Sequence, residues 1–234
     1  MASIPGREVL SLAKLQDLTR RVALVTGGSR GLGLQMAEVL GELGAKVAIT
    51  ARRADELDAA AGHLKSLGIE AMPLVCDMGK LATIAAMVEE IIDVLGPIDI
   101  LVNNAGTSWG GADDRAPSGR LEQGDRSERD GDLRRHAGGG PSLHGAAAGR
   151  QVINIASIQR LTGTYPDGVP TLAYNTSKGA VVNMTRTLAN EWAPLGINVN
   201  AIAPGYFPTK MTARLDQGAT AHMAPMRRGG GPKI

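Results

Sequence analysis

The sequence predicts an α/β domain built on a doubly wound parallel sheet. Short apolar runs of strand length alternate along the chain with longer stretches in which apolar residues recur at helical spacing. The first apolar run leads into a glycine-rich turn, as in a strand-turn-helix unit. A length of 234 residues with 43% hydrophobic residues suits a single domain with a sizeable core.

The expected elements follow one another in regular order. Strands are predicted at 22–25, 47–50, 71–76, 98–106, 151–157 and 197–205. Helices are predicted around 34–43, at 54–67, at 80–95 and over the stretch that contains YNTSK. Because helices alternate with strands, the strands should run parallel, with ligands bound at their carboxyl ends. Residues 1–19 are expected to be an N-terminal extension, and 20–234 the domain.

Composition excludes several classes of partner. The formal charge is +2 with acids and bases interleaved, which gives no reason to expect nucleic acid or a membrane surface. A single cysteine, Cys76, permits no internal disulfide, and the four scattered histidines predict no metal site. The opening stretch lacks the apolar segment of a signal peptide, and no apolar run is long enough to span a membrane. We therefore expect a soluble protein in a reducing cytoplasm.

The glycine-rich turn predicts a dinucleotide site. Gly27, Gly31 and Gly33 lie between an apolar strand and a helix, where they allow a tight turn and a close approach to a pyrophosphate. The pyrophosphate would lie at the helix N-terminus, where free N–H groups favour anions. The alternative is a simple strand-helix turn without a ligand.

The residues after the second strand indicate which dinucleotide is bound. An NAD-binding site usually has Asp or Glu there, whereas this chain has Arg52 and Arg53, with Arg30 in the glycine turn. Guanidinium groups suit a 2′-phosphate, so NADP(H) is preferred over NAD(H). The alternative for Arg53 is a solvated residue at a helix start.

A third pattern predicts acid catalysis. Tyr174 and Lys178 are four residues apart on an expected helix and so share one face, where the ammonium can lower the phenol pKa. Tyr174 could then act as a general acid. Ser157, at the carboxyl end of a strand, can donate to a carbonyl oxygen of the substrate while the cofactor delivers hydride.

Five motifs in order, TGGSRGLG, NNAG, INIAS, YNTSK and NAIAPGYFPT, resemble the short-chain dehydrogenase/reductase family over residues 20–110 and 151–232. The resemblance implies a Rossmann fold, with Ser157, Tyr174 and Lys178 as catalytic residues and Asp77 at the adenine. It also implies that Asn103–Gly106 lie beside the cofactor. The predicted cofactor-binding set is Gly27, Ser29, Arg30, Gly31, Leu32, Gly33, Arg52, Arg53, Asp77, Asn104, Ala105, Gly106, Tyr174, Lys178, Pro204, Gly205 and Thr209.

The resemblance also narrows the substrate. NNAGTSWG and PGYFPTKMT are most similar to bacterial 3-oxoacyl-[acyl-carrier-protein] reductases, including those associated with rhamnolipid synthesis, and sugar-acid and polyol dehydrogenases come close. It implies a small carbonyl or alcohol substrate and a homotetramer or dimer. The residues expected at the pocket rim are Trp109, Tyr165, Tyr206 and Phe207.

Residues 111–150 break the pattern. Their only large aliphatic residues are Leu121, Leu133 and Leu143, so no core helix is expected where the family has one that carries a catalytic Asn. Permitted codons read one nucleotide later give AAWSKVIDLNVTATFVVTQ from Gly119, which resembles that helix. We interpret the segment as a shifted reading frame. A disordered Gly/Arg insertion and a basic loop that contacts RNA are the alternatives.

These departures predict a weakened protein. Losing the core helix removes on the order of 10 kcal/mol of buried apolar contact. The family's last helix and strand are also expected to be missing after residue 234, which would leave a sheet edge exposed. Two alternatives to an active reductase follow: a relic that binds NADPH loosely without turnover, and a module that binds nucleic acid through the Arg-rich loop.

Overall fold

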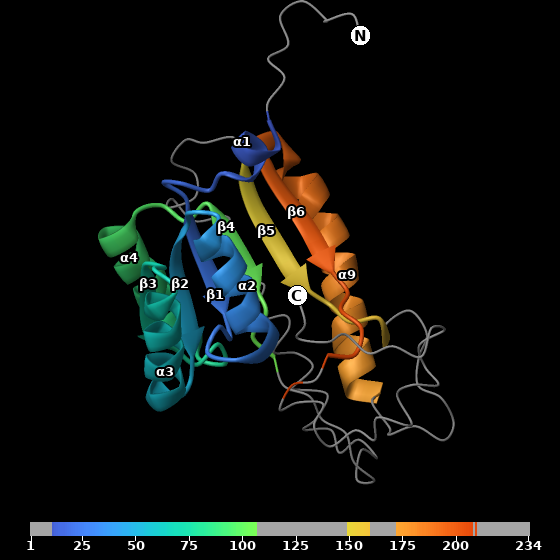
Figure 1. Cartoon of the computed structure of the whole chain (residues 1–234). Helices are drawn as coiled ribbons and strands as arrows, with labels where there is room; N and C mark the ends of the chain where they lie inside the picture. Colours follow the sequence, from blue (N-terminus) through green and yellow to red (C-terminus); the bar gives the residue numbers. More distant parts are fainter. Residues whose placement is uncertain (1–10, 107–148, 160–171, 208, 210–234) are drawn as a thin grey trace, which may run out of the picture.

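The computed structural model describes residues 11–106, 149–159, 172–207 and 209. They contain one parallel six-stranded sheet with the strand order β3-β2-β1-β4-β5-β6 (Figure 1). The strands are β1 (Val22–Thr26), β2 (Lys46–Ala51), β3 (Ala71–Val75), β4 (Ile100–Asn103), β5 (Arg150–Ile155) and β6 (Ile197–Ile202). All five strand pairings are parallel, which confirms the doubly wound sheet.

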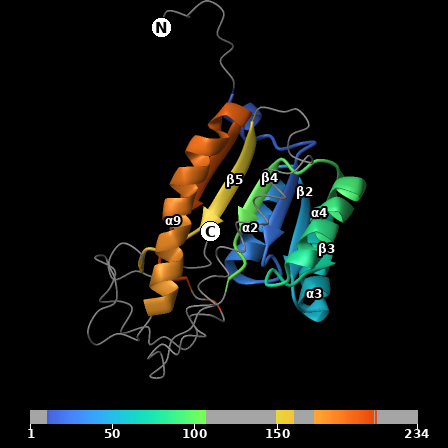
Figure 2. The ribbon, with the colours of Figure 1, turned by 180° about the vertical axis from the view of Figure 1, so that it is seen from behind.

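Helices cover both faces of this sheet. They are α1 (Leu12–Gln16), α2 (Gly31–Glu42), α3 (Ala54–Ser66), α4 (Leu81–Leu95) and α9 (Leu172–Trp192), followed by the 3₁₀ turn η1 (Ala193–Leu195). The helices α2 and α3 pack on one face, and α4 and α9 pack on the other (Figures 1 and 2). The described part of the chain therefore forms three layers, with the sheet in the middle.

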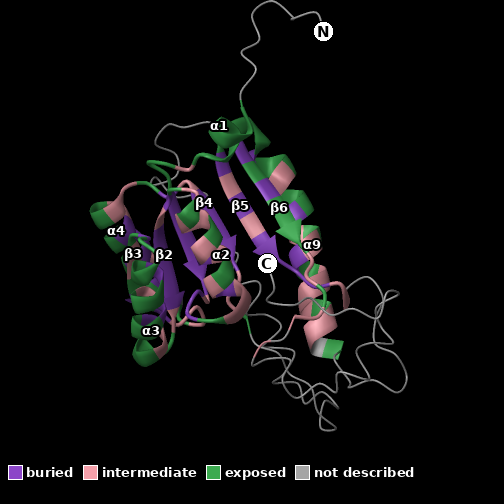
Figure 3. Ribbon diagram, in the orientation of Figure 1, coloured by how far each residue is buried: buried purple, intermediate pink, exposed green. Residues whose placement is uncertain are grey.

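Alternation along the strands divides the core into two layers. In β1, Val22 and Leu24 face α4 and α9, whereas Ala23 and Val25 face α2 and α3. All residues of β1 are buried, and the central strands are the most buried part of the molecule (Figure 3). This two-sided burial explains why the predicted strands appear in the sequence as continuous apolar runs.

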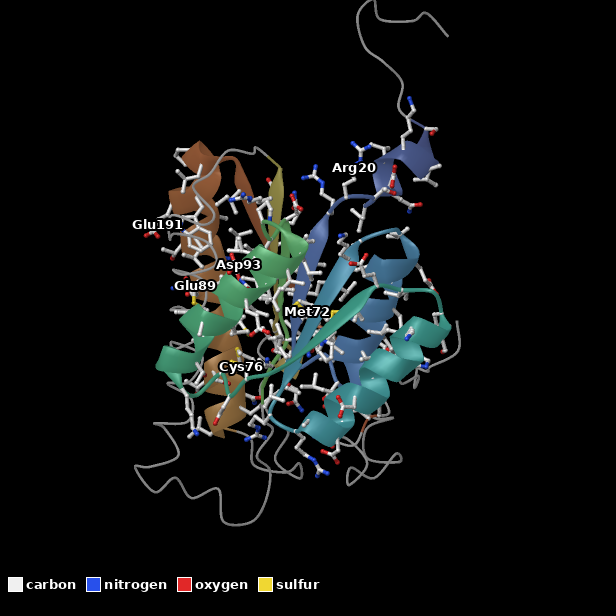
Figure 4. All side chains as sticks on the ribbon, turned by 90° about the vertical axis from the view of Figure 1, so that its left-hand side faces the viewer. Arg20, Met72, Cys76, Glu89, Asp93 and Glu191 are labelled. Atoms are coloured by element: carbon white, nitrogen blue, oxygen red, sulfur yellow. The ribbon has the colours of Figure 1, made fainter. Side chains whose placement is uncertain are left out.

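The helix α4 packs beside the edge strand β3 with one buried face. Met72 and Cys76 belong to the core layer under α4, and Glu89 and Asp93 are on its outer side (Figure 4). Burial raises the pKa of the Cys76 thiol. The amphipathic pattern that predicted this helix thus corresponds to one buried and one solvated face.

Most predicted bounds agree with the structure to within one or two residues. The strand predicted at 197–205 already ends at Ile202, and the helix predicted around 34–43 already begins at Gly31. The strand predicted at 98–106 ends at Asn103 because the Asn104 amide N–H bonds to Val102 and Thr26 in a turn rather than in the sheet ladder. Cys76 follows β3 instead of ending it, and Lys80 is the N-cap of α4. The extension at 1–19 contains the short helix α1, which the sequence did not predict.

The segment 111–150, which breaks the sequence pattern, ends earlier than the sequence indicates. Arg150 is not part of it: this residue is 3% exposed and opens β5, where it pairs with Ile197 of β6. The strand starts there because its backbone completes the ladder with β6. Residues 111–148, and with them the shifted-frame interpretation, lie outside the described residues, as does the chain from 210 to 234. Within the described ranges β6 is the sheet edge opposite β3, with Asn198 and Asn200 exposed.

Two valines of α4 test the packing of this layer. Val88 is 3% exposed in the core under the helix, and Val94 is 62% exposed. We expect Val88→Ala to lower the free energy of unfolding by about 2 kcal/mol, because two buried methyl groups are lost and a cavity remains. The same change at Val94 should alter it by less than about 0.5 kcal/mol. Urea denaturation of both variants measures this, and equal losses would contradict the assigned burial.

Candidate active site

The glycine turn lies at the carboxyl end of β1, where the strand order changes direction. From β1 the chain continues to β2 on one side, and β4 lies on the other side. Ligands of doubly wound sheets bind at this switch point. Gly27 and Gly31 have φ values of +66° and +56°, a left-handed conformation that favours glycine.

Two further glycines are required by close packing. A Cβ on Gly33 would lie 2.2 Å from the Gly27 carbonyl oxygen and 2.5 Å from Asn104 Nδ2. A Cβ on Gly28 would lie 2.8 Å from the side chain of Ile49, which is fully buried in β2. The first turn of α2 can therefore approach the sheet only because these side chains are absent.

Asn104 fastens the glycine turn to β4. Its Nδ2 donates to the carbonyls of Thr26 at 3.0 Å and Gly27 at 3.1 Å. The Thr26 hydroxyl oxygen in turn accepts from the backbone N–H of Asn104 and of Ala105, both at 3.0 Å. The loops after β1 and β4 consequently form one rigid rim at the carboxyl edge of the sheet.

The N-terminus of α2 fits a phosphate group. Its N-cap residue, Arg30, makes no side-chain capping hydrogen bond within the described residues, and the N–H groups in the first turn of a helix favour anions. Thr209 lies over this turn, its side chain 3.4 Å from a Cβ placed on Gly31. The structure thus brings Thr209, predicted from the chain's far end, to the glycine turn.

Two of the arginines predicted to bind a 2′-phosphate come together beside α3. Arg30 Nη1 lies 2.8 Å from Glu56 Oε1, and Arg53 Nε lies 3.8 Å from the same atom. Arg53 also binds both carboxylate oxygens of Asp55, which raises the pKa of Arg53 and lowers that of Asp55. Arg52 is exposed at the same helix start. The arginines therefore lie together near the carboxyl end of β2, where Glu56 and Asp55 are the acidic partners of Arg30 and Arg53.

Asp77 lies at the neighbouring strand end. Its Oδ1 accepts from the Gly79 backbone N–H at 3.0 Å, which forms a tight turn between β3 and α4. The carboxyl ends of β2 and β3 are adjacent in the sheet. Asp77 therefore lies next to the strand end that leads to Arg52 and Arg53, and its contact with an adenine stays a prediction.

Ser157 follows β5 and is 7% exposed. Its Oγ accepts from the Gln159 N–H at 3.3 Å. The loops after β5 and β6 are joined by the Ile158 N–H, which donates to the Pro204 carbonyl at 3.1 Å, and by Gln159 Nε2, which lies 2.9 Å from the Tyr206 hydroxyl. These bonds hold Ser157 beside the Pro204 segment.

The helix α9 brings Tyr174 and Lys178 to the same edge, where its first turns extend past the ends of β5 and β6 (Figure 1). Lys178 Nζ donates to the Ile155 carbonyl at 2.7 Å, two residues before Ser157. It lies 5.9 Å from the centre of the Tyr174 ring and 3.9 Å from a Cβ placed on Gly106. An ammonium group is therefore held between the predicted acid and the loop after β4.

The remaining predictions concern the pocket rim, metal ligands and membrane-spanning helices. Of the four expected rim residues, Tyr206 and Phe207 are partly buried beside the Pro204 segment, whereas Trp109 and Tyr165 lie outside the described residues. In the ranges that the structure describes, no three His, Cys, Asp or Glu side chains gather as metal ligands. No helix in these ranges combines the length and the apolar character needed to cross a membrane.

Sequence reasoning missed several residues that shape this site. Gly28 was not counted with the other glycines, although it lies in the same motif. A signal was available for Thr26 and Asn154, since a polar residue inside or at the end of an apolar strand needs a buried partner. Glu56 had no such signal, because its two arginine partners come together only in the folded chain.

Comparisons with known proteins point to one family. The model of the short chain dehydrogenase family matches residues 21–220. Gluconate 5-dehydrogenase of Gluconobacter oxydans is 36% identical over 213 residues, covering 88% of this chain and 78% of the relative. The rhamnolipids biosynthesis 3-oxoacyl-[acyl-carrier-protein] reductase of Pseudomonas aeruginosa is 34% identical over 222 residues, covering 93% and 86%. The solved Pseudomonas aeruginosa RhlG/NADP active-site complex has a TM-score of 0.82 and 36% identity, covering 92% and 86%.

Replacing Gly33 tests the close packing of the glycine turn. Gly33→Ala should lower the free energy of unfolding by about 1–3 kcal/mol, because backbone and an amide must move to admit the methyl group. Gly62→Ala in α3 is the matched control, since a Cβ there meets no atom within 4 Å in the described structure. It should raise the stability by about 0.5–1 kcal/mol. Thermal denaturation measures both, and a neutral Gly33→Ala would contradict the packing.

Proposed function

Because the chain belongs to the short-chain dehydrogenase family, we propose that this oxidoreductase reduces a carbonyl group with NADPH through Ser157, Tyr174 and Lys178. The observation that supports this assignment is the contact of Lys178 with the Ile155 carbonyl, because it brings YNTSK of α9 to the strand that leads to Ser157. The reverse reaction would oxidise a secondary alcohol with NADP⁺.

The residues at the carboxyl edge fit a nicotinamide dinucleotide. The turn at Gly27 and Gly31 with the N-terminus of α2 would hold the pyrophosphate, and Asp77 would lie beside the adenine. Arg30 and Arg53 would bind the 2′-phosphate, for which their guanidinium groups are suited. When bound, the reduced nicotinamide supplies the hydride that is added to the carbonyl carbon of the substrate.

The chain's own groups would then handle the oxygen of that carbonyl. The Ser157 hydroxyl donates a hydrogen bond to it and so stabilises the negative charge that develops there. Tyr174 transfers its phenolic proton to the same oxygen, which completes the alcohol. The Lys178 ammonium would lie near the phenolate that remains, because its bond to the Ile155 carbonyl keeps it near the ring.

We further propose a 3-oxoacyl thioester as the substrate class and NADP(H) as the preferred cofactor. The name of the Pseudomonas relative supports the substrate class, and the NADP in the solved Pseudomonas complex supports the cofactor. The name of the Gluconobacter relative supports a second candidate, oxidation of a sugar acid such as gluconate. The two candidates differ in the group beside the carbonyl, a thioester on an acyl chain or a row of hydroxyls.

Two assays with the full chain separate these possibilities. The first follows NADPH absorbance with a 3-oxoacyl thioester, and the second follows NADP⁺ reduction with gluconate. Turnover in the first alone supports the 3-oxoacyl assignment, and turnover in the second alone replaces it. NADPH binding without turnover in either assay would identify a nucleotide-binding relic. Sequencing of the gene across codons 108–152 tests the shifted-frame interpretation in parallel.

Tyr174 is the predicted proton donor, so its hydroxyl should be essential. We expect Tyr174→Phe to lower kcat at least about 100-fold, because the alcohol oxygen loses its proton source. Fluorescence titration should show NADPH affinity within about twofold of the parent, since the ring and Lys178 remain. A variant that retains most of its turnover would assign the acid to another group.

Arg53 tests the cofactor preference. Arg53→Ala should weaken NADPH binding roughly tenfold, the effect of one lost charged hydrogen bond, and leave NADH binding unchanged. Arg186→Ala is the control, because this arginine is exposed on α9, away from the carboxyl end of β2. Equal losses for both cofactors would exclude a 2′-phosphate contact at Arg53.

A further inference from the structure

A buried line of polar side chains joins β4, β5 and α9. Asn103 Nδ2 donates to Asn154 Oδ1 at 2.9 Å, and Asn154 Nδ2 donates to Thr185 Oγ1 at 2.9 Å. The Thr185 hydroxyl donates to the Val181 carbonyl at 2.7 Å. The exposed fractions of Asn103, Asn154 and Thr185 are only 5%, 0% and 7%. Water therefore has little access to these side chains, and each of them finds its hydrogen-bond partner in the next one.

The hydroxyl of Thr185 fixes the direction of the line. A hydroxyl has one proton, and that of Thr185 is given to Val181 in its own helix. Thr185 can therefore only accept from Asn154, which must present its NH₂ group to the helix and its oxygen to Asn103. The orientation of the Asn154 amide is thus determined by both neighbours, and a rotated or shifted helix would break the line.

This line of hydrogen bonds restricts the position of α9 more narrowly than apolar contacts would. Apolar side chains pack at many offsets, whereas a hydrogen bond requires a narrow distance and angle. A helix that slid along β5 would leave the Asn154 amide buried and unsatisfied, which costs more than the bond itself contributes. The line therefore restricts how α9 can sit on the sheet, beyond what the apolar contacts of α9 require.

These hydrogen bonds hold the face of α9 that carries Tyr174 and Lys178, the proposed catalytic residues. Thr185 lies seven residues after Lys178 and eleven after Tyr174, two and three helical turns, so the three residues share one face. Lys178 is bound to the carbonyl of Ile155, and Asn154 is the residue directly before it. Two adjacent residues of β5 therefore hold the same face of α9 at two levels.

We propose that Asn154 and Thr185 are positioning residues, which set the place of α9 on β5 so that Lys178 and Tyr174 face Ser157. The inference rests on the proposed function for its catalytic meaning, and on the hydrogen bonds alone for its structural part. Asn103 extends the line to β4, the strand that leads to the loop at Gly106 beside Lys178. The line thus ties the predicted acid and its lysine to β4 and β5, the two strands that lead into the loops beside them.

Thr185→Val tests the proposal, because valine keeps the shape and removes the hydroxyl. Thr187→Val is the matched control: Thr187 lies on the same helix outside the buried line, and its hydroxyl donates to the Asn183 carbonyl at 3.2 Å. Thr185→Ser, which restores the hydroxyl, is the rescue variant. The melting temperature of each variant is measured, so that any loss of folded protein is separated from a shift of α9.

The first readout does not require turnover. Limited acetylation with acetic anhydride, followed by peptide mass spectrometry, measures how accessible each lysine amine is in the folded chain. We expect Lys178 to react roughly fivefold faster in Thr185→Val, the factor that corresponds to losing one hydrogen bond that positions α9. Lys65, exposed at the end of α3, should react at the parent rate in every variant. An unchanged Lys178 rate in Thr185→Val would overturn the proposal.

The second readout uses the reductase assay. Thr185→Val should lower kcat roughly fivefold at a nearly unchanged KM for NADPH, Thr185→Ser should restore it, and Thr187→Val should have no effect. A lower melting temperature without a change in kcat or in Lys178 reactivity would reduce Thr185 to a stability role and overturn the proposal. Faster Lys178 acetylation in Thr185→Val, with a parent chain that shows no turnover, would support the positioning and refute the proposed function.

Discussion

The candidate site depends on one contact, in which the Asn104 amide donates two hydrogen bonds, one to the Thr26 carbonyl and one to the Gly27 carbonyl. It joins the loops after β1 and β4 across the point where the strand order changes direction. The contact exists only because Gly33 leaves room for the amide, so the glycine motif is as much a packing requirement as a phosphate cradle. At this rim the N-terminus of α2 borders the proposed pyrophosphate site, and Gly106 lies beside Lys178.

The charges around the proposed 2′-phosphate position are more balanced than two arginines alone would suggest. Glu56 is the less exposed partner of Arg30, and Asp55 binds Arg53 from solvent. A phosphate that enters must share these guanidinium groups with the two carboxylates. Exposed pairs of this kind contribute little stability, so the arginines can exchange partners at low cost. The acids thus hold the arginines near the end of β2, and they would limit the proposed preference for the extra phosphate.

The proposed chemistry is assembled from distant parts of the chain. Ser157 comes from the end of β5, Lys178 and Tyr174 come from α9, and Thr209 reaches the glycine turn from beyond β6. Hydrogen bonds between the loops after β5 and β6 and the buried line through Asn154 hold these parts in place. Functional groups that are held on separate rigid elements are well suited to a reaction in which hydride and proton arrive at adjacent atoms.

The sequence by itself determined the parallel sheet, the helices other than α1 and the glycine turn, because apolar periodicity and glycine chemistry are local properties. It also indicated that Tyr174 and Lys178 share a face, since that follows from helical spacing alone. It could not indicate that Lys178 would bind the Ile155 carbonyl, that Glu56 would pair with Arg30, or that Asn154 would meet Thr185. Those contacts join residues 23 to 31 positions apart, and only the packing of helices on the sheet brings them together.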